Sequence, residues 1–275
     1  MKIKFVLLVI VCMSTLQACG RQGGDYAKFA TDNTIVNHSD SPVAAYPYVG
    51  SVQTNLSITS KITGITYPYH VYLPYNYSLS AKSYSVIYGT DAQWVFPHFS
   101  QRLDVRNKDV IFVGIEEGPL NSNRRFDDFL GSGVSNYMSF FKTEFVPMIE
   151  STYRTNHERT YVGTSLGGLL GSSFLAKEPL GEPYFKNYLL FDGSFFALTE
   201  KDIQAEEERF NASKKLDVTL ILTSASPGNV NDVTVYEQRY ESRQYEDFTI
   251  HRLRYLVPHN DVANPSFDEA IEFIY

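Results

Sequence analysis

The sequence is poor in cysteine: only two of its 275 residues are cysteine, Cys12 and Cys19, and both lie close to the amino terminus. The rest of the chain therefore has no disulfide, no thiolate nucleophile and no thiolate metal site. Positive charge is also scarce, since 24 lysines and arginines face 31 aspartates and glutamates, for a net charge of −7. Such a chain repels a phosphate backbone, so we do not expect nucleic acid as a partner.

The apolar stretch at residues 5–13 is too short to cross a bilayer as a stable helix. It follows Lys2 and Lys4, and the tetrapeptide Leu-Gln-Ala-Cys comes after it at residues 16–19. This order resembles a bacterial lipoprotein signal, in which the thiol of the final residue carries diacylglycerol. We therefore expect a signal peptide at 1–18, a lipid anchor on Cys19 and a place in the bacterial cell envelope, at the outer membrane or the periplasmic face.

Hydrophobic residues make up 43% of the chain and aromatic residues 15%, which is enough for a full-sized core and excludes disorder of the whole. Residues 19–50 are rich in Gly, Asn, Asp, Ser and Thr without a sustained period, and they predict a flexible tether. The length that remains suits one domain, which we place at 51–275.

Short apolar runs alternate with longer amphipathic ones after an initial hairpin at 55–61 and 65–73. The predicted strands are 84–88, 110–115, 160–163, 187–191, 218–223 and 250–257, and the predicted helices are 135–153, 166–177, 199–210, 232–245 and 265–275. Repeated strand–helix units imply a mostly parallel central sheet with helices on both faces. The antiparallel hairpin should extend that sheet at its edge.

The pentapeptide Gly-Thr-Ser-Leu-Gly at 163–167 lies between a predicted strand and a predicted helix. Glycines two residues before and two after a serine let the backbone turn sharply there, which raises the serine hydroxyl above the sheet as a nucleophile elbow. Ser165 is therefore the candidate nucleophile, and the amino end of the following helix would help to stabilise an oxyanion. The alternative is a tight turn with an incidental serine.

A serine nucleophile needs a base, and in α/β-hydrolases the chain order is Ser, acid, His. Of the two histidines that follow Ser165, His251 lies within a predicted strand, whereas His259 lies in the loop before the last helix. We therefore assign the base to His259. For the acid, the chain order favours Asp232, which could equally cap a helix; Asp192 ranks second, Glu237 third, and a Ser–His dyad without an acid stays open.

Oxyanion donors are backbone groups, so the sequence can only indicate their place. The N–H of Leu166 follows the nucleophile, and the second donor is Ala92 or Gln93, in the loop at 89–94. Arg124, Arg125 and Trp94 are candidate substrate contacts, since guanidinium groups bind anionic or catecholate groups through forked donors. In the other interpretation, the arginines pair with Asp127 or Asp128 and shape their own loop.

Three segments resemble the Putative esterase family: 140–155, with Phe-Val-Pro-Met-Ile-Glu; 161–170, with Gly-Thr-Ser-Leu-Gly-Gly; and 190–196, Leu-Phe-Asp-Gly-Ser-Phe-Phe. That family includes siderophore (enterochelin) esterases, S-formylglutathione hydrolase, feruloyl and acetyl-xylan esterases and mycolyltransferases. The resemblance runs from about residue 65 to the end and is strongest to the hydrolases similar to periplasmic siderophore esterases. It implies an α/β-hydrolase fold and matches the family's Arg-rich loop at 123–129 and its terminal His-loop-helix at 258–271.

The sequence departs from that branch at positions beside the catalytic groups. Thr164 and Asn260 stand where His and Gly are usual, and Asp192-Gly193-Ser194 stands where Asp-Pro-Ser is common. None of these changes removes a catalytic group, but they imply a different leaving-group pocket.

The resulting hypothesis is a membrane-tethered serine esterase that needs no metal or organic cofactor. Its substrate would be a small ester, either of the siderophore type or an acyl or feruloyl ester on a glycan. Two alternatives stay open: a catalytically silent ligand-binding lipoprotein on the same fold, and an acyltransferase that uses an alcohol in place of water.

Overall fold

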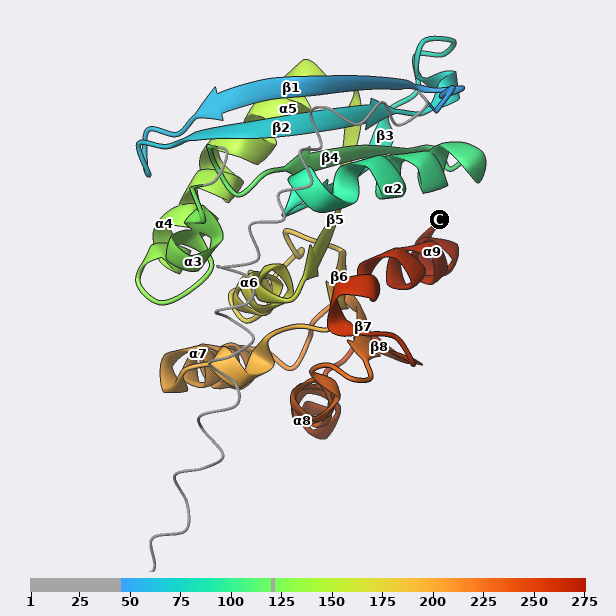
Figure 1. Cartoon of the computed structure of the whole chain (residues 1–275). Helices are drawn as coiled ribbons and strands as arrows, with labels where there is room; N and C mark the ends of the chain where they lie inside the picture. Colours follow the sequence, from blue (N-terminus) through green and yellow to red (C-terminus); the bar gives the residue numbers. More distant parts are fainter. Residues whose placement is uncertain (1–45, 120–121) are drawn as a thin grey trace, which may run out of the picture. The chain divides into compact units, whose positions relative to one another are not determined.

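The computed structural model describes residues 46–119 and 122–275, and within them an eight-stranded sheet lies between two layers of helices (Figure 1). The predicted signal peptide, Cys19 and most of the predicted tether lie outside these residues. The end of the predicted tether, residues 46–50, is described, and there Val49 and Gly50 donate their backbone N–H groups to Asp104 at 2.9 and 2.7 Å. Residues Pro47–Tyr275 form one compact unit.

The eight strands are β1 (Ser51–Thr59), β2 (Thr66–Leu73), β3 (Tyr84–Gly89), β4 (Val110–Ile115), β5 (Thr155–Thr164), β6 (Asn187–Phe191), β7 (Thr219–Ala225) and β8 (Thr249–Tyr255). Their order across the sheet is β1-β2-β4-β3-β5-β6-β7-β8. The pairs β1–β2 and β2–β4 are antiparallel, and all pairs from β4 to β8 are parallel. The predicted α/β class, with a mostly parallel sheet and an antiparallel hairpin at its edge, is confirmed.

The helices are α2 (Ala92–Val105), α3 (Arg124–Asp128), α4 (Gly133–Phe140), α5 (Val146–Thr152), α6 (Leu166–Leu175), α7 (Glu200–Ala212), α8 (Val230–Arg243) and α9 (Ala263–Ile274). Short turns of helix lie at η1 (Tyr75–Tyr77), η3 (Phe195–Ala197) and η4 (His259–Asp261), and a π-helical turn, η2 (Phe141–Phe145), joins α4 to α5. The predicted helix at 135–153 is therefore three consecutive helical segments. In the part of the chain that the structure describes, no helix is both long and apolar enough to span a bilayer.

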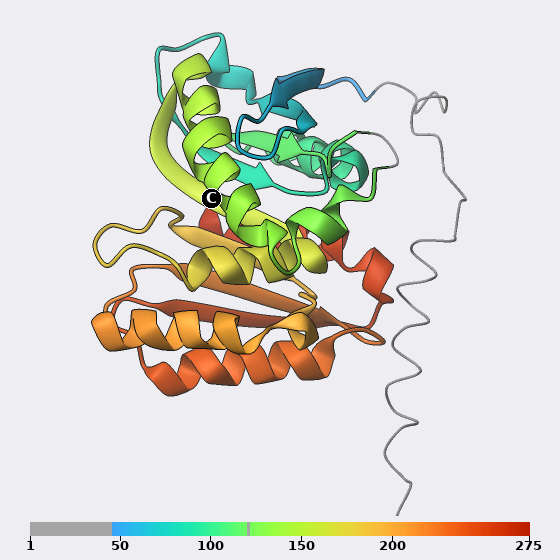
Figure 2. The ribbon, with the colours of Figure 1, turned by 90° about the vertical axis from the view of Figure 1, so that its left-hand side faces the viewer.

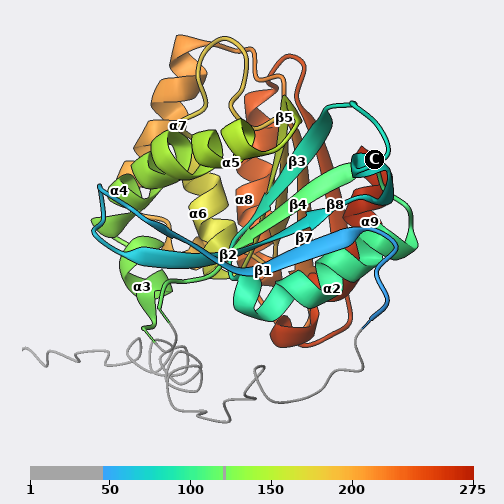
Figure 3. The same ribbon diagram turned by 90° about the horizontal axis from the view of Figure 1, so that it is seen from above.

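Alternate side chains of each strand enter two separate cores, because successive residues of a strand point to opposite faces of the sheet. In β3, Val86 and Tyr88 join one core and Ile87 joins the other. The first core packs against α4, α5, α6 and α8, and the second against α2 and α9. Figures 2 and 3 show this division, with α6 and α7 on one face and α2 beside α9 on the other.

Helices α2 and α9 are joined by an aromatic stack. The rings of Phe99 in α2 and Phe267 in α9 are parallel, with their centroids 3.8 Å apart and an interplanar angle of 4°. Both rings are almost fully buried. This contact fixes α9, and with it the loop that precedes α9, against the helix that follows β3.

The sequence analysis missed α2 and treated its start as a loop. Its apolar spacing is helical, since Ala92, Val95, Phe96, Phe99 and Leu103 are all buried. Pro97 lies inside the helix, however, and a proline inside a helical pattern normally marks a boundary. The tertiary packing of this face on the sheet overrides that local signal.

Candidate active site

Ser165 lies at the turn between β5 and α6, as the nucleophile elbow predicts. Its backbone has φ 59° and ψ −117°, a conformation that costs energy for any residue other than glycine. A Cβ atom on Gly163 would lie 2.4 Å from the backbone of Gly167, so only glycine allows the strand and the helix to approach this closely. The sharp turn places Ser165 at the carboxyl edge of the sheet, partly exposed.

Asp192 follows the neighbouring strand β6 and is completely buried. Its carboxylate accepts backbone N–H groups from Ala225 at 3.0 Å and from Asn229 at 3.0 and 3.2 Å. These donors compensate the loss of water around the carboxylate. A third donor is His259, whose Nδ1 lies 2.5 Å from Asp192 Oδ2.

His259 begins η4, after β8 and before α9, and its side chain is 23% exposed. Since β5, β6, β7 and β8 are parallel, the residues that follow them meet at the same edge of the sheet. Ser165 and Asp192 are also linked through backbone: Ser165 N–H donates to Phe191 O at 3.0 Å. The serine, the buried carboxylate and the imidazole thus share one rim.

The hydroxyl of Ser165 lies 3.2 Å from Ser194 Oγ, a contact that the sequence analysis did not foresee. Within the described residues, no hydrogen bond joins Ser165 to His259. Catalytic hydrogen bonds are often open before substrate binds, so this geometry is compatible with a serine–histidine pair that closes on the substrate.

Of the carboxylates considered as the acid, Asp192 is the one that contacts His259. Asp192, ranked second, holds His259, whereas Asp232 lies in the first turn of α8, whose N-cap is Asn229. At that position the negative charge of Asp232 interacts favourably with the positive amino end of the helix dipole. Glu237, ranked third, accepts a hydrogen bond from Arg252 Nε at 3.2 Å.

The predicted oxyanion donors lie at two helix starts. Leu166 is the first residue of α6, and Ala92 and Gln93 are the first two residues of α2. The N–H groups of a first helical turn have no acceptor within the helix, so they can donate to another group. The strands before these helices, β5 and β3, are neighbours, and Thr90 N–H donates to Val162 O at 3.2 Å. Both helix starts therefore lie at the same edge as Ser165.

Both candidate substrate arginines form ion pairs within the chain. Arg124 donates hydrogen bonds to Asp127 at 3.0 Å and to Asp128 at 2.7 Å, which is the pairing that the alternative interpretation of this loop predicts. Arg125 instead donates two hydrogen bonds, of 3.1 and 2.9 Å, to Asp91, a pairing that the sequence analysis did not foresee. Trp94 is 51% exposed, and its ring lies 5.2 Å from the Arg125 guanidinium carbon.

The pair of Arg125 and Asp91 predicts a stability effect. Burial raises the pKa of Asp91, and the charge of Arg125 opposes that rise. Arg125→Ala leaves this buried carboxyl unpaired and should lower the free energy of unfolding by about 3 kcal/mol. The measurement is thermal unfolding at pH 7 of the four proteins of the Arg125→Ala and Asp91→Asn cycle, in which the loss should be smaller in the Asp91→Asn background. An equal loss of unfolding free energy on Arg125→Ala in both backgrounds would show that the Arg125–Asp91 pair is not the cause.

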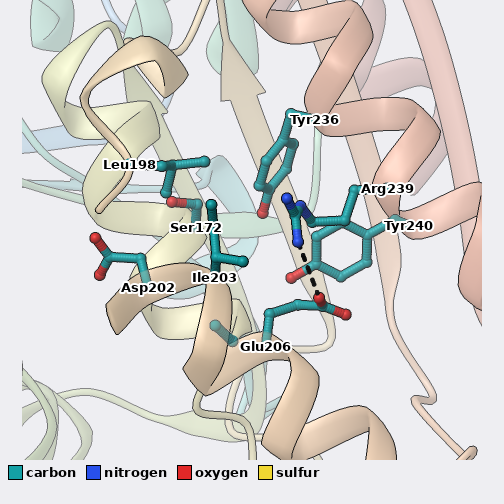
Figure 4. A pocket seen from close by; sticks show the side chains of 9 residues that line it. Ser172, Leu198, Asp202, Ile203, Glu206, Tyr236, Arg239 and Tyr240 are labelled. Atoms are coloured by element: carbon teal, nitrogen blue, oxygen red, sulfur yellow. Dashed lines mark ion pairs between the residues drawn. The ribbon is translucent and has the colours of Figure 1, made fainter. Parts of the chain in front are cut away.

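Two cavities lie away from this rim. One, of about 10 Å³ between α6, α7 and α8, is lined by Ser172, Glu206, Tyr236 and Arg239, among others, and has room for about one water molecule (Figure 4). The other, of about 350 Å³, includes Asn187 and Thr219, which begin β6 and β7, and so lies at the opposite edge of the sheet. Neither is lined by Ser165, Asp192 or His259.

Within residues 46–119 and 122–275, no three His, Cys, Asp or Glu side chains are grouped so that they could hold a metal ion. The histidines outside the rim mostly pair with single carboxylates. His70 contacts Glu116 at 2.7 Å, His98 contacts Asp268 at 3.2 Å and His157 contacts Glu150 at 2.9 Å.

Part of the chain is similar in sequence to a known protein family. Residues 60–178, which include the elbow and Ser165, match the model of the Putative esterase family. No curated protein is significantly similar to the chain in sequence.

Solved structures share the fold. An IroE-like serine hydrolase from Shewanella oneidensis is 23% identical with a TM-score of 0.69, over 82% of this chain and 79% of that one. The BES protein from Bacillus cereus is 20% identical with a TM-score of 0.70, over 81% and 95%. The siderophore hydrolase EstB from Aspergillus nidulans is 14% identical with a TM-score of 0.68, over 84% and 96%.

At these identities, the structural likeness establishes the α/β-hydrolase fold, and the family model adds the class of reaction. The chain is similar to the Putative esterase family over residues 60–178, and this match together with the shared α/β-hydrolase fold indicates an ester hydrolase.

Proposed function

We propose that the protein is a serine hydrolase of carboxylic esters, with Ser165 as nucleophile, His259 as base and Asp192 as the acid. The observation that carries this proposal is the 2.5 Å contact between His259 Nδ1 and the buried Asp192 carboxylate, on the same rim as the strained Ser165. A carboxylate in that position selects the tautomer whose Nε2 accepts a proton and stabilises the imidazolium that forms.

In the first half of the reaction, Ser165 Oγ attacks the ester carbonyl carbon while His259 Nε2 takes the hydroxyl proton. The tetrahedral intermediate collapses, and the leaving alkoxide takes that proton from Nε2. This leaves an acyl group on Ser165 Oγ. Water then attacks the acyl carbon and gives one proton to Nε2, which returns it to Ser165 as the carboxylic acid departs.

The negative oxygen of each tetrahedral intermediate needs fixed donors. We assign them to the backbone N–H of Leu166 and to that of Ala92 or Gln93, at the starts of α6 and α2. Helix starts present N–H groups without intrahelical partners and the positive end of the helix dipole.

The substrate we propose is a small ester of the siderophore type or an acyl or feruloyl ester on a glycan. The ion pairs of Arg124 and Arg125 favour the neutral glycan esters, because an anionic substrate would have to compete with Asp91, Asp127 and Asp128. Exposed Trp94 offers a ring on which an aromatic acyl group could stack. Turnover of p-nitrophenyl, feruloyl and catecholate siderophore esters, compared as kcat/KM, would decide between these classes.

We also propose that the chain is anchored in the bacterial cell envelope through Cys19, which supports substrates met outside the cytoplasm. Full-length protein should fractionate with membranes, and Cys19→Ala should release it.

The reaction is tested with a fluorophosphonate probe, which reacts with activated serines. The wild-type protein should be labelled at Ser165, and Ser165→Ala should not be labelled, because the probe bonds to the nucleophilic Oγ. The serine that is labelled should be identified by mass spectrometry of the digested protein. If the folded wild type is not labelled, the ligand-binding alternative gains support over the enzyme.

A further inference from the structure

Asn229 holds the N-cap position of α8 but does not cap the helix with its side chain. Its amide Nδ2 instead donates to the carbonyl oxygens of Asp192 and Gly193, at 2.9 and 3.3 Å. Its backbone N–H also donates to the Asp192 carboxylate. An N-cap asparagine ordinarily accepts a backbone N–H of the first helical turn, so the helix gives up this stabilisation while the side chain holds another loop.

The loop that Asn229 holds, residues 192–194, contacts both the nucleophile and the base. Asp192 Oδ2 lies 2.5 Å from His259 Nδ1. At the other end of the loop, Ser194 N–H donates to Ser165 O at 3.0 Å, and the two serine hydroxyls lie 3.2 Å apart. A shift of this loop would therefore move the acid away from the imidazole and disturb the serine together.

The residue before Asn229 leaves room for this arrangement. A Cβ atom on Gly228 would lie 2.5 Å from Asp192 Oδ2 and 2.6 Å from Ala225 Cβ. Any side chain there would push on the carboxylate itself. The segment 225–229 thus holds Asp192 with two backbone donors to its carboxylate and one side-chain amide donor to its carbonyl oxygen.

We propose that Asn229 is a positioning residue for the catalytic apparatus, fixing the 192–194 loop so that Asp192 and Ser194 keep their contacts with His259 and Ser165. This inference rests on the proposed function for its kinetic consequence. Its structural consequence, the fixed Asp192–His259 hydrogen bond, can be measured without turnover.

Two substitutions separate positioning from ordinary stabilisation. Asn229→Ala removes both amide hydrogen bonds. Asn229→Ser also removes the reach to the two carbonyls, but serine is a favoured N-cap and should restore capping of α8. The control is Asn231→Ala, in the same helical turn, since Asn231 is exposed.

In both Asn229 variants, kcat per active site, with sites counted by fluorophosphonate titration, should fall about 10- to 100-fold, while KM changes less than about threefold. The Tm of Asn229→Ser should lie above that of Asn229→Ala, so activity and stability would not fall together. Asn231→Ala should keep wild-type kcat. If Asn229→Ser has wild-type kcat per site, or if only the number of titratable sites falls, the residue merely supports the fold and the proposal is overturned.

The second readout is the proton NMR signal of His259 Nδ1–H at low field, identified by its loss in His259→Ala. It should be present in the wild type and in Asn231→Ala, and should move upfield or vanish in both Asn229 variants. An unchanged signal in those variants would overturn the positioning role even if the protein proves inactive. Conversely, if the wild type shows the signal but hydrolyses no ester, and both Asn229 variants lose the signal, the positioning role stands while the proposed function fails.

Discussion

Replacing His259 with alanine should lower kcat for an ester substrate by roughly 10⁴-fold or more, with little change in KM. The imidazole is the group placed to take the proton of Ser165, and its Nδ1 is fixed by the buried Asp192 carboxylate at 2.5 Å. Without it the serine attacks as a neutral hydroxyl. Steady-state hydrolysis of a p-nitrophenyl ester at neutral pH measures the effect.

The matched control is His251→Ala. His251 lies in β8, and its ring stacks on Phe273, with centroids 4.8 Å apart, away from the carboxyl edge of the sheet. This variant should keep kcat within about twofold of the wild type. Near wild-type turnover in His259→Ala would remove the assigned base, whatever the control shows.

Asp192→Asn should lower kcat by about 10⁴-fold, whereas Asp232→Asn should leave it within about twofold. Three N–H donors point at the Asp192 carboxylate, from Ala225, Asn229 and His259. A neutral amide has only one accepting oxygen, so its NH₂ group must face at least one of these donors. The imidazole then loses the partner that selects its tautomer.

Measuring both asparagine variants side by side distinguishes three arrangements. A large loss in Asp192→Asn alone supports the assigned acid. A large loss of kcat in Asp232→Asn alone would identify Asp232 as the acid, and small losses of kcat in both variants would indicate a Ser–His dyad. Circular dichroism should first establish that Asp192→Asn is folded, because its side chain is completely buried.

The sequence predicted the layered fold because local periodicity carries most of that information. In β3 the run Val86-Ile87-Tyr88 is apolar throughout, as expected of a strand buried on both faces, and the structure sends Val86 and Tyr88 to one core and Ile87 to the other. The start of α2 was not visible in the same way, because Pro97 interrupts a helix that is stabilised mainly by its contacts with the sheet and α9.

The elbow could be located because its glycines and its serine are adjacent in the chain, whereas the acid could not. Asp192 and Asp232 both follow strands of the same sheet within a short distance in sequence, and both positions are common for a polar residue. What separates them is that Asp192 is enclosed by N–H donors from the loop after β7. Such an enclosure depends on how two loops meet in space.

The buried ion pair of Asp91 and Arg125 could not be predicted from the sequence for a similar reason. The two residues are 34 positions apart, and Arg125 has nearer acidic neighbours, Asp127 and Asp128, which Arg124 takes instead. Charge proximity along the chain therefore gave the correct partner for one arginine and not for the other.

The parallel stack of Phe99 on Phe267 has a consequence for when the enzyme becomes competent. It joins the helix after the proposed base to the helix that begins with a proposed oxyanion donor, so these two parts of the site depend on packing between distant parts of the chain. During synthesis, Phe99 and Ser165 emerge well before Phe267. A nascent chain would therefore expose its serine without a working base beside it, and would gain activity only when α9 docks against α2.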